Sequence, residues 1–182
     1  DDGGKLRGLI GYDGRGHEGF DIPEELASAL ALTHTVSRLG DRKIGHQVEL
    51  RMVEAAESLG WTYSRDMRSV SSWQVEEQWT FDHHTMTMSV LCTVPEREEA
   101  WVFCKGSFEA VSGLCTRCES PSSGDAESGQ NWREVLEELA ELSESLSTKG
   151  CYVLAVARKR VQFSTISKVF AGKNSHEKTR DH

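Results

Sequence analysis

The spacing of apolar residues changes once along this chain, and that change restricts the fold to one with separate helical and strand regions. Apolar residues recur at α-helical spacing in residues 21–36 and 47–59, and a turn at 39–41 joins these segments into a helical hairpin. In residues 73–81 they alternate with polar residues instead, as in a β-strand with one buried face. The other predicted elements are strands at 61–63, 87–93, 100–105 and 151–157, a short helix at 107–114 and a long helix from 131. Together these elements predict an α+β arrangement.

The centre of the domain is predicted to be a β-hairpin around the charged turn 95–99. If this hairpin is symmetric about its turn, Cys92 pairs with Trp101 and Met88 pairs with Lys105. Lys105 then lies beside the beginning of the preceding strand.

The length of 182 residues fits a single domain with polar ends. We expect a flexible glycine-rich segment at 1–19, a folded domain at 20–166 and a polar tail at 167–182. Within the folded domain, residues 119–130 are rich in Ser, Gly and Asp and are expected to form a mobile loop.

Composition excludes several classes of partner. The formal net charge of −8 argues against a nucleic-acid phosphate partner. No apolar stretch approaches the roughly 20 residues needed to span a bilayer. The five cysteines stand largely in apolar contexts, which indicates a reducing, cytosolic environment. Because the chain has neither an initiator Met nor a signal peptide, we expect a piece of a longer protein. We also expect this piece to be a monomer.

Two short segments have residues suited to a nucleotide. Phe81 ends an alternating strand just before a polar turn, where an aromatic ring could stack on a flat base. Lys105 is followed by Gly106. The glycine permits close backbone approach, and the lysine places an ammonium group near a ribose or phosphate. Each feature also has an ordinary structural explanation, a core Phe in one case and a common Lys-Gly turn in the other.

The order of these segments resembles the nucleotide-binding domain of P-type ATPases. That family has an F-S-x-x-x-(K/R)-x-M-S-V segment, and here Phe81 precedes Met88-Ser89-Val90. It then has a K-G-A-P-E segment, and here the residues are Lys105-Gly106-Ser107-Phe108-Glu109. The segment 44–49 is similar to a family turn in which a Gly is followed four residues later by a Glu, which is Glu49 here. The residues around it look most like the type-five subfamily, which transports cations or polyamines.

A fourth segment, 150–157, is similar to the family strand Gly-x-Arg-x-Leu-Ala-Leu-Ala. Leu154 begins its Leu-Ala-Val-Ala core, while Tyr152 stands where the family has a phosphate-binding Arg. Met86 likewise stands at a position that is usually basic. Two cationic contacts of the family are therefore missing.

The resemblance implies an antiparallel β-sheet of about six strands flanked by helical hairpins. It also implies an ATP site in which Phe81 stacks on the adenine, Glu49 accepts from the adenine amino group, and Lys105 with Gly106 lines the ribose side. Leu154 and Tyr152 would complete the nucleotide-binding set.

The function implied is an ATP-binding domain that presents the γ-phosphate of Mg-ATP to a phosphorylation domain. The Asp-Lys-Thr-Gly-Thr motif that is phosphorylated in this family is absent, so we expect no catalytic residue and no turnover by this chain. Its partners would be the phosphorylation and actuator domains of a parent protein, on the cytosolic face of a membrane. The alternative is a degenerate domain that acts as a regulatory or protein-interaction module. We predict no metal site, since Cys115 and Cys118 lack a second ligand pair.

Overall fold

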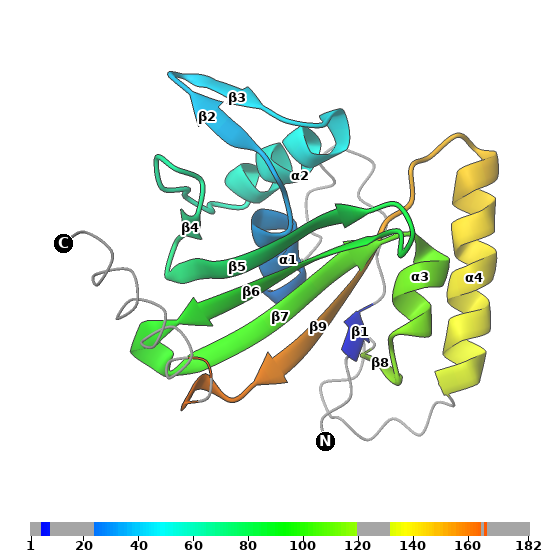
Figure 1. Ribbon diagram of the computed structural model, residues 1–182. Coiled ribbons are helices and arrows are strands. Elements are labelled where there is room, and N and C mark those ends of the chain that lie inside the picture. The colour runs from blue at the N-terminus through cyan, green and yellow to red at the C-terminus, as the bar shows by residue number, and fades with distance from the viewer. Residues whose placement is uncertain (1–4, 8–23, 120–131, 165, 167–182) are drawn as a thin grey trace.

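The computed structural model describes residues 5–7, 24–119, 132–164 and 166. A seven-stranded sheet, with the strand order β4-β5-β6-β7-β9-β1-β8, forms the body of the domain (Figure 1). The strands of this sheet are β1 (Lys5–Arg7), β4 (Ser69–Val70), β5 (Trp73–Asp82), β6 (Thr87–Val94), β7 (Glu99–Gly106), β8 (Arg117–Glu119) and β9 (Ala155–Val161). Neighbouring strands are antiparallel except for β1 and β8, which are parallel. The α+β prediction is confirmed, with one strand more than the expected six.

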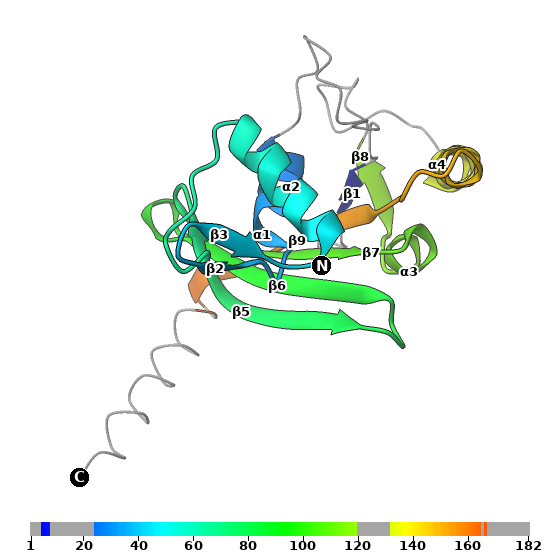
Figure 2. The same cartoon turned by 90° about the horizontal axis from the view of Figure 1, so that it is seen from above.

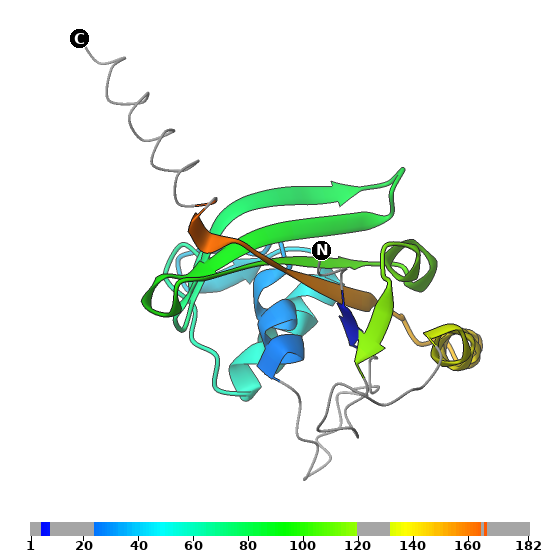
Figure 3. The same cartoon turned by 90° about the horizontal axis from the view of Figure 1, so that it is seen from below.

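The four α-helices of the described residues fall into two groups. The first pair is α1 (Glu24–Leu32) and α2 (Gln47–Ser58), and the second is α3 (Phe108–Gly113) and α4 (Trp132–Thr148). Seen from above, α1 and α2 lie together over the sheet, whereas α3 and α4 lie together away from them (Figure 2). In the view from below, the neighbouring strands β5, β6, β7 and β9 lie on one side of α1 and α2 (Figure 3).

The hydrophobic core follows this division. The larger cluster joins α1 and α2 to the sheet through fully buried residues such as Val53, Val90 and Phe103. A smaller cluster around Val111 and Ala157 joins α3 to β9. Since successive side chains of a strand point to opposite faces, β7 contributes Phe103 to the first cluster and Cys104 to the second.

The predicted central hairpin is confirmed residue by residue. Cys92 pairs with Trp101, and Met88 pairs with Lys105. The turn between them contains a short 3-10 helix, η1 (Pro95–Arg97), which ends at Glu98 with a left-handed φ of 51°. The register that the sequence predicts therefore places Lys105 next to the Met-Ser-Val strand.

Several predicted elements differ from the structure. The first helix ends at Leu32 rather than residue 36, and the hydroxyl of Thr33 donates to the carbonyl of Ala29. The turn at 39–41 is not a simple helix–helix link. It lies within a separate β-hairpin of β2 (Ser37–Leu39) and β3 (Arg42–Ile44), with Gly40 in the left-handed region at φ 61°.

The last strand begins at Ala155 rather than at residue 151. Its partner β7 ends at Gly106, which pairs with Ala155, so the preceding residues have no strand beside them in the described part of the chain. The predicted strand at 61–63 is reduced to a single bridge between Tyr63 and Val70.

The predicted flexible segments lie mostly outside the described residues. Residues 5–7, within the glycine-rich segment 1–19, form the short strand β1 between β9 and β8. Residues 120–130 of the predicted loop and the tail 167–182 are not described. The domain boundaries therefore stay a prediction.

Candidate functional site

Three neighbouring strands place Met88, Lys105 and Val156 in one row, and a fourth strand carries Phe81. Met88 of β6 pairs with Lys105 of β7, which in turn pairs with Val156 of β9. Phe81 lies in the adjacent strand β5, within an irregularity of pairing just before the Asp82–Thr87 pair. The row therefore runs across the sheet from Phe81 to Val156, beneath the helices α1 and α2.

Glu49 reaches this row from the first turn of α2. The helix begins after His46, whose ring nitrogen Nδ1 accepts from the backbone N–H of Val48. An acidic residue in the first turn suits the positive end of the helix dipole. Glu49 is nevertheless 8% exposed, which is rare for a carboxylate without partners.

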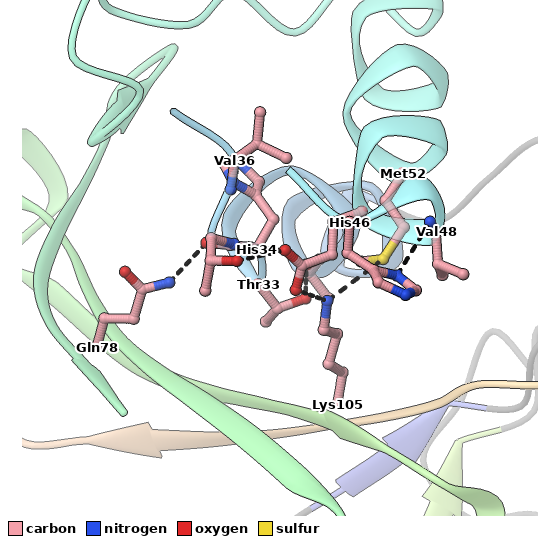
Figure 4. Close-up of polar contacts among 11 residues, drawn as sticks. Thr33, His34, Val36, His46, Val48, Met52, Gln78 and Lys105 are labelled. Atoms are coloured by element: carbon pink, nitrogen blue, oxygen red, sulfur yellow. Dashed lines mark hydrogen bonds and ion pairs between the residues drawn. The ribbon is translucent and has the colours of Figure 1, made fainter. Parts of the chain in front are cut away.

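The Glu49 carboxylate has a partner on each oxygen (Figure 4). Lys105 Nζ donates to Oε1 at 2.7 Å. The backbone N–H and the hydroxyl of Thr35 donate to Oε2 at 2.9 and 2.6 Å. Burial acts to raise the pKa of Glu49, but the hydrogen bonds from Lys105 and Thr35 outweigh it and hold the pKa below its ordinary value. The carboxylate is therefore ionised and held in place.

Lys105 is buried against the same group. The residue is 5% exposed, and its Nζ also makes a long contact of 3.7 Å with Met52 Sδ. Burial lowers the pKa of Lys105, and the pairing with Glu49 offsets part of this shift. A buried ion pair joins the two residues that the resemblance assigns to opposite sides of the nucleotide.

Phe81 offers the exposed aromatic surface of the site. It is 40% exposed, so it is not the core Phe of the alternative interpretation. Its ring meets His83 edge-on, with ring centroids 5.1 Å apart. Part of the ring surface is therefore open to solvent and lies outside the core.

Gly106 is required by a close backbone approach. A Cβ atom at this position would lie 2.3 Å from the carbonyl oxygen of Met86 and 2.9 Å from Thr87 Cγ2. The next residue, Ser107, donates its N–H to that same carbonyl and caps α3 by accepting from the N–H of Ala110. The Lys-Gly signal thus has a structural cause as well as its proposed functional one.

Tyr152 and Leu154 lie just before the Gly106–Ala155 pair, at the end of the row. Tyr152 is 73% exposed and Leu154 is half-buried. They precede the paired part of β9, and within the described part of the chain neither is hydrogen bonded to Glu49, Phe81 or Lys105. Their roles stay a prediction.

Sequence reasoning missed Thr35 and His34. His34 is buried between the Glu49–Lys105 pair and Tyr63; its Nδ1 accepts from the N–H of Val36, and its carbonyl accepts from Gln78. Desolvation lowers the pKa of His34 to about 4, so the ring is neutral. The sequence signal for these two residues is the polar run 33–35 after the apolar part of the first helix. The helix predicted to end at residue 36 included this run.

The fold agrees with a comparison against protein families. The model of the P-type ATPase cytoplasmic domain N matches residues 25–181. The chain belongs to this family. The N domain is the nucleotide-binding domain of these ATPases, so a general role in binding ATP follows for this chain. Comparison with curated protein sequences gives no match.

Two kinds of feature are absent from the described residues of this N domain. No described helix is long and apolar enough to cross a membrane. The described residues also contain no group of three or more His, Cys, Asp or Glu side chains placed to hold a metal ion.

Proposed function

We propose that this N domain binds Mg-ATP across the row from Phe81 to Lys105. The adenine stacks on Phe81, Glu49 accepts from its amino group, and Lys105 with Gly106 lines the ribose side. The phosphates then leave the domain past Leu154 and Tyr152, toward the phosphorylation domain of a parent P-type ATPase. Recognition of this kind contributes by positioning the γ-phosphate rather than by reacting with it.

The observation that carries this proposal is the convergence of residues distant in sequence. Glu49 and Lys105 are 56 positions apart and meet at 2.7 Å. Lys105 is separated from the strand of Phe81 by the single strand β6. An acceptor, a cation and an exposed aromatic ring are the three groups that an adenine nucleotide requires.

The proposed affinity is low for the family. Met86 and Tyr152 stand at positions where the family has basic residues. A charge-assisted hydrogen bond contributes roughly 1.5–3 kcal/mol, so two missing contacts weaken binding by tenfold or more.

The alternative is that this N domain serves as a regulatory or protein-interaction module. One observation favours it: the Glu49 carboxylate and the Lys105 ammonium already satisfy each other, with side chains only 10% and 6% exposed. A site that binds nothing would be stable in this form.

The parent protein is proposed to be a magnesium-dependent, membrane-bound P-type ATPase of the type-five subfamily. The segment 44–49 and the Gly60-Trp61 pair at the end of α2 support this subfamily. In such a parent the actuator and phosphorylation domains would be the partners, and the N domain would face the cytosol as a monomeric unit.

Calorimetric titration of Mg-ATP into the wild-type chain and the Phe81→Ala variant tests the proposal. Stacking on an aromatic ring predicts that the alanine variant loses at least about fivefold in affinity, roughly 1 kcal/mol. Phe81→Tyr should retain most of the affinity. Leu142→Ala, which truncates an exposed apolar residue on α4, is the matched control and should bind like the wild type. Equal affinity for ATP in the wild type and Phe81→Ala would reject the stacking site.

A further inference from the structure

The Glu49 carboxylate accepts three hydrogen bonds from the protein itself, and this bears on how a base could reach it. Thr35 supplies two donors to Oε2, and Lys105 supplies one to Oε1. The side chain of Glu49 is only 10% exposed. An incoming amino group therefore meets a carboxylate whose two oxygens already accept hydrogen bonds from Thr35 and Lys105.

The two partners of Glu49 reach it through different parts of the chain. Thr35 contacts Oε2 through its backbone as well as its side chain, and it lies in the connection directly after α1. Lys105 is held by Oε1 and by a weak contact to Met52 Sδ at 3.7 Å. Thr35 is thus the fixed partner, and the flexible Lys105 side chain is the one that can leave.

We propose that adenine nucleotides enter this site by exchange: the base amino group replaces Lys105 Nζ on Glu49 Oε1, while Thr35 holds Oε2 in place. The inference rests on the proposed ATP site. Lys105 moves from the carboxylate to the negatively charged part of the nucleotide, so neither charge is left buried without a partner. Thr35 is a positioning residue that acts through Glu49 and does not itself contact the nucleotide.

This arrangement also predicts a preference for the base. A carboxylate fixed by Thr35 accepts from the 6-amino group of adenine. ITP has a carbonyl oxygen in place of that amino group, which leaves two acceptors facing each other. The ATP-to-ITP affinity ratio therefore reports the position of the Glu49 carboxylate independently of the total stability of the protein.

The first test observes the lysine ammonium groups directly, by NMR of protein labelled with ¹⁵N at lysine Nζ. Titration with Mg-ATP should shift or broaden the Lys105 ammonium signal at the same saturation point as the backbone amides of the site. Lys43, which pairs with Glu57, is an internal control whose signal should not move. If the amides saturate while the Lys105 ammonium stays unchanged, the exchange is wrong although the ATP site is correct. If Mg-ATP moves neither set of signals, the proposed function fails, and the exchange fails with it.

The second test compares Thr35→Val with Thr33→Val. Both changes remove a threonine hydroxyl, but the Thr33 hydroxyl donates to the α1 carbonyl of Ala29 and not to Glu49. Thr35→Val should lower the ATP-to-ITP affinity ratio by about three- to tenfold, the loss expected for one hydrogen bond of ordinary net strength, because the backbone N–H of residue 35 still holds Oε2. Thr35→Ser should restore the ratio, and Thr33→Val should leave it unchanged. An unchanged ratio in Thr35→Val would overturn the positioning role.

Discussion

Removal of either charge of the buried Glu49–Lys105 pair should destabilise the domain strongly, and removal of both should cost much less than the sum. The contact is 2.7 Å long, and both side chains are almost excluded from solvent. Under these conditions an unpaired charge typically costs about 3–5 kcal/mol, whereas replacing the whole pair by neutral side chains of similar volume is often nearly neutral. The pair therefore predicts strong coupling between substitutions at the two positions.

The magnitude can be bounded from each side. In Glu49→Gln the Lys105 ammonium loses its counter-ion, but it can escape by deprotonation. Deprotonating a lysine of ordinary pKa at an assay pH of about 7 costs about 5 kcal/mol, and this sets a ceiling on the loss. In Lys105→Met the carboxylate keeps both hydrogen bonds from Thr35, so we expect about 3 kcal/mol. The double variant should lose about 1–2 kcal/mol, which gives an interaction energy of about 3 kcal/mol or more.

Urea unfolding at pH 7, followed by tryptophan fluorescence and far-UV circular dichroism, measures these free energies. Glu54→Gln is the matched control on the same helix, because the Arg51–Glu54 pair is exposed and should contribute less than about 0.5 kcal/mol. If the losses of the two single variants add within about 0.5 kcal/mol in the double variant, the pair is not coupled and this reasoning is refuted.

Three further predictions concern other parts of the domain. Burial lowers the pKa of His34 from 6.5 to about 4, so between these pH values the unfolded chain binds a proton that the folded chain does not. The free energy of unfolding should therefore rise by about 3 kcal/mol from pH 4 to 6.5. In urea titrations, His34→Asn should remove this part of the pH dependence. Gly106→Ala should lower the free energy of unfolding by about 2–4 kcal/mol, because the added Cβ would lie 2.3 Å from a backbone carbonyl oxygen. Gly113 faces open space, so Gly113→Ala should be neutral or slightly stabilising. Equal thermal melting of the two variants would contradict this. The exposed Cys151 should react with a thiol reagent in the folded state. Burial raises the pKa of Cys92, so this thiol should react only on unfolding. Rapid labelling of Cys92 in native buffer would disprove its burial.

The sheet was the most predictable part of the fold because its signals are local. Alternation from Trp73 onward and the charged turn after Val94 set both the strands and their register, since a shift by one residue would turn Val90 and Cys92 out of the core. The β2–β3 hairpin was missed because Leu39 and Ile44 are exposed and give no burial pattern. The late start of β9 was missed because only the length of its partner strand sets that boundary.

The site was predicted as a set of residues and not as a network. The motifs pointed to Glu49 and Lys105 separately, and spacing placed Lys105 on the correct strand row. That the two side chains would contact each other depends on how α2 packs on the sheet, which no local pattern encodes. Thr35 could not be found in this way either, since its role depends on where the first helix ends.

The central claim is that this N domain binds ATP on the row from Phe81 to Lys105. Its most direct test is a Mg-ATP titration of ¹⁵N-labelled protein followed by amide NMR shifts. The account predicts saturable shifts at Glu49, Phe81, Lys105 and Gly106, with none along α4. An absence of shifts at several millimolar ATP, or shifts confined to another face, would contradict it.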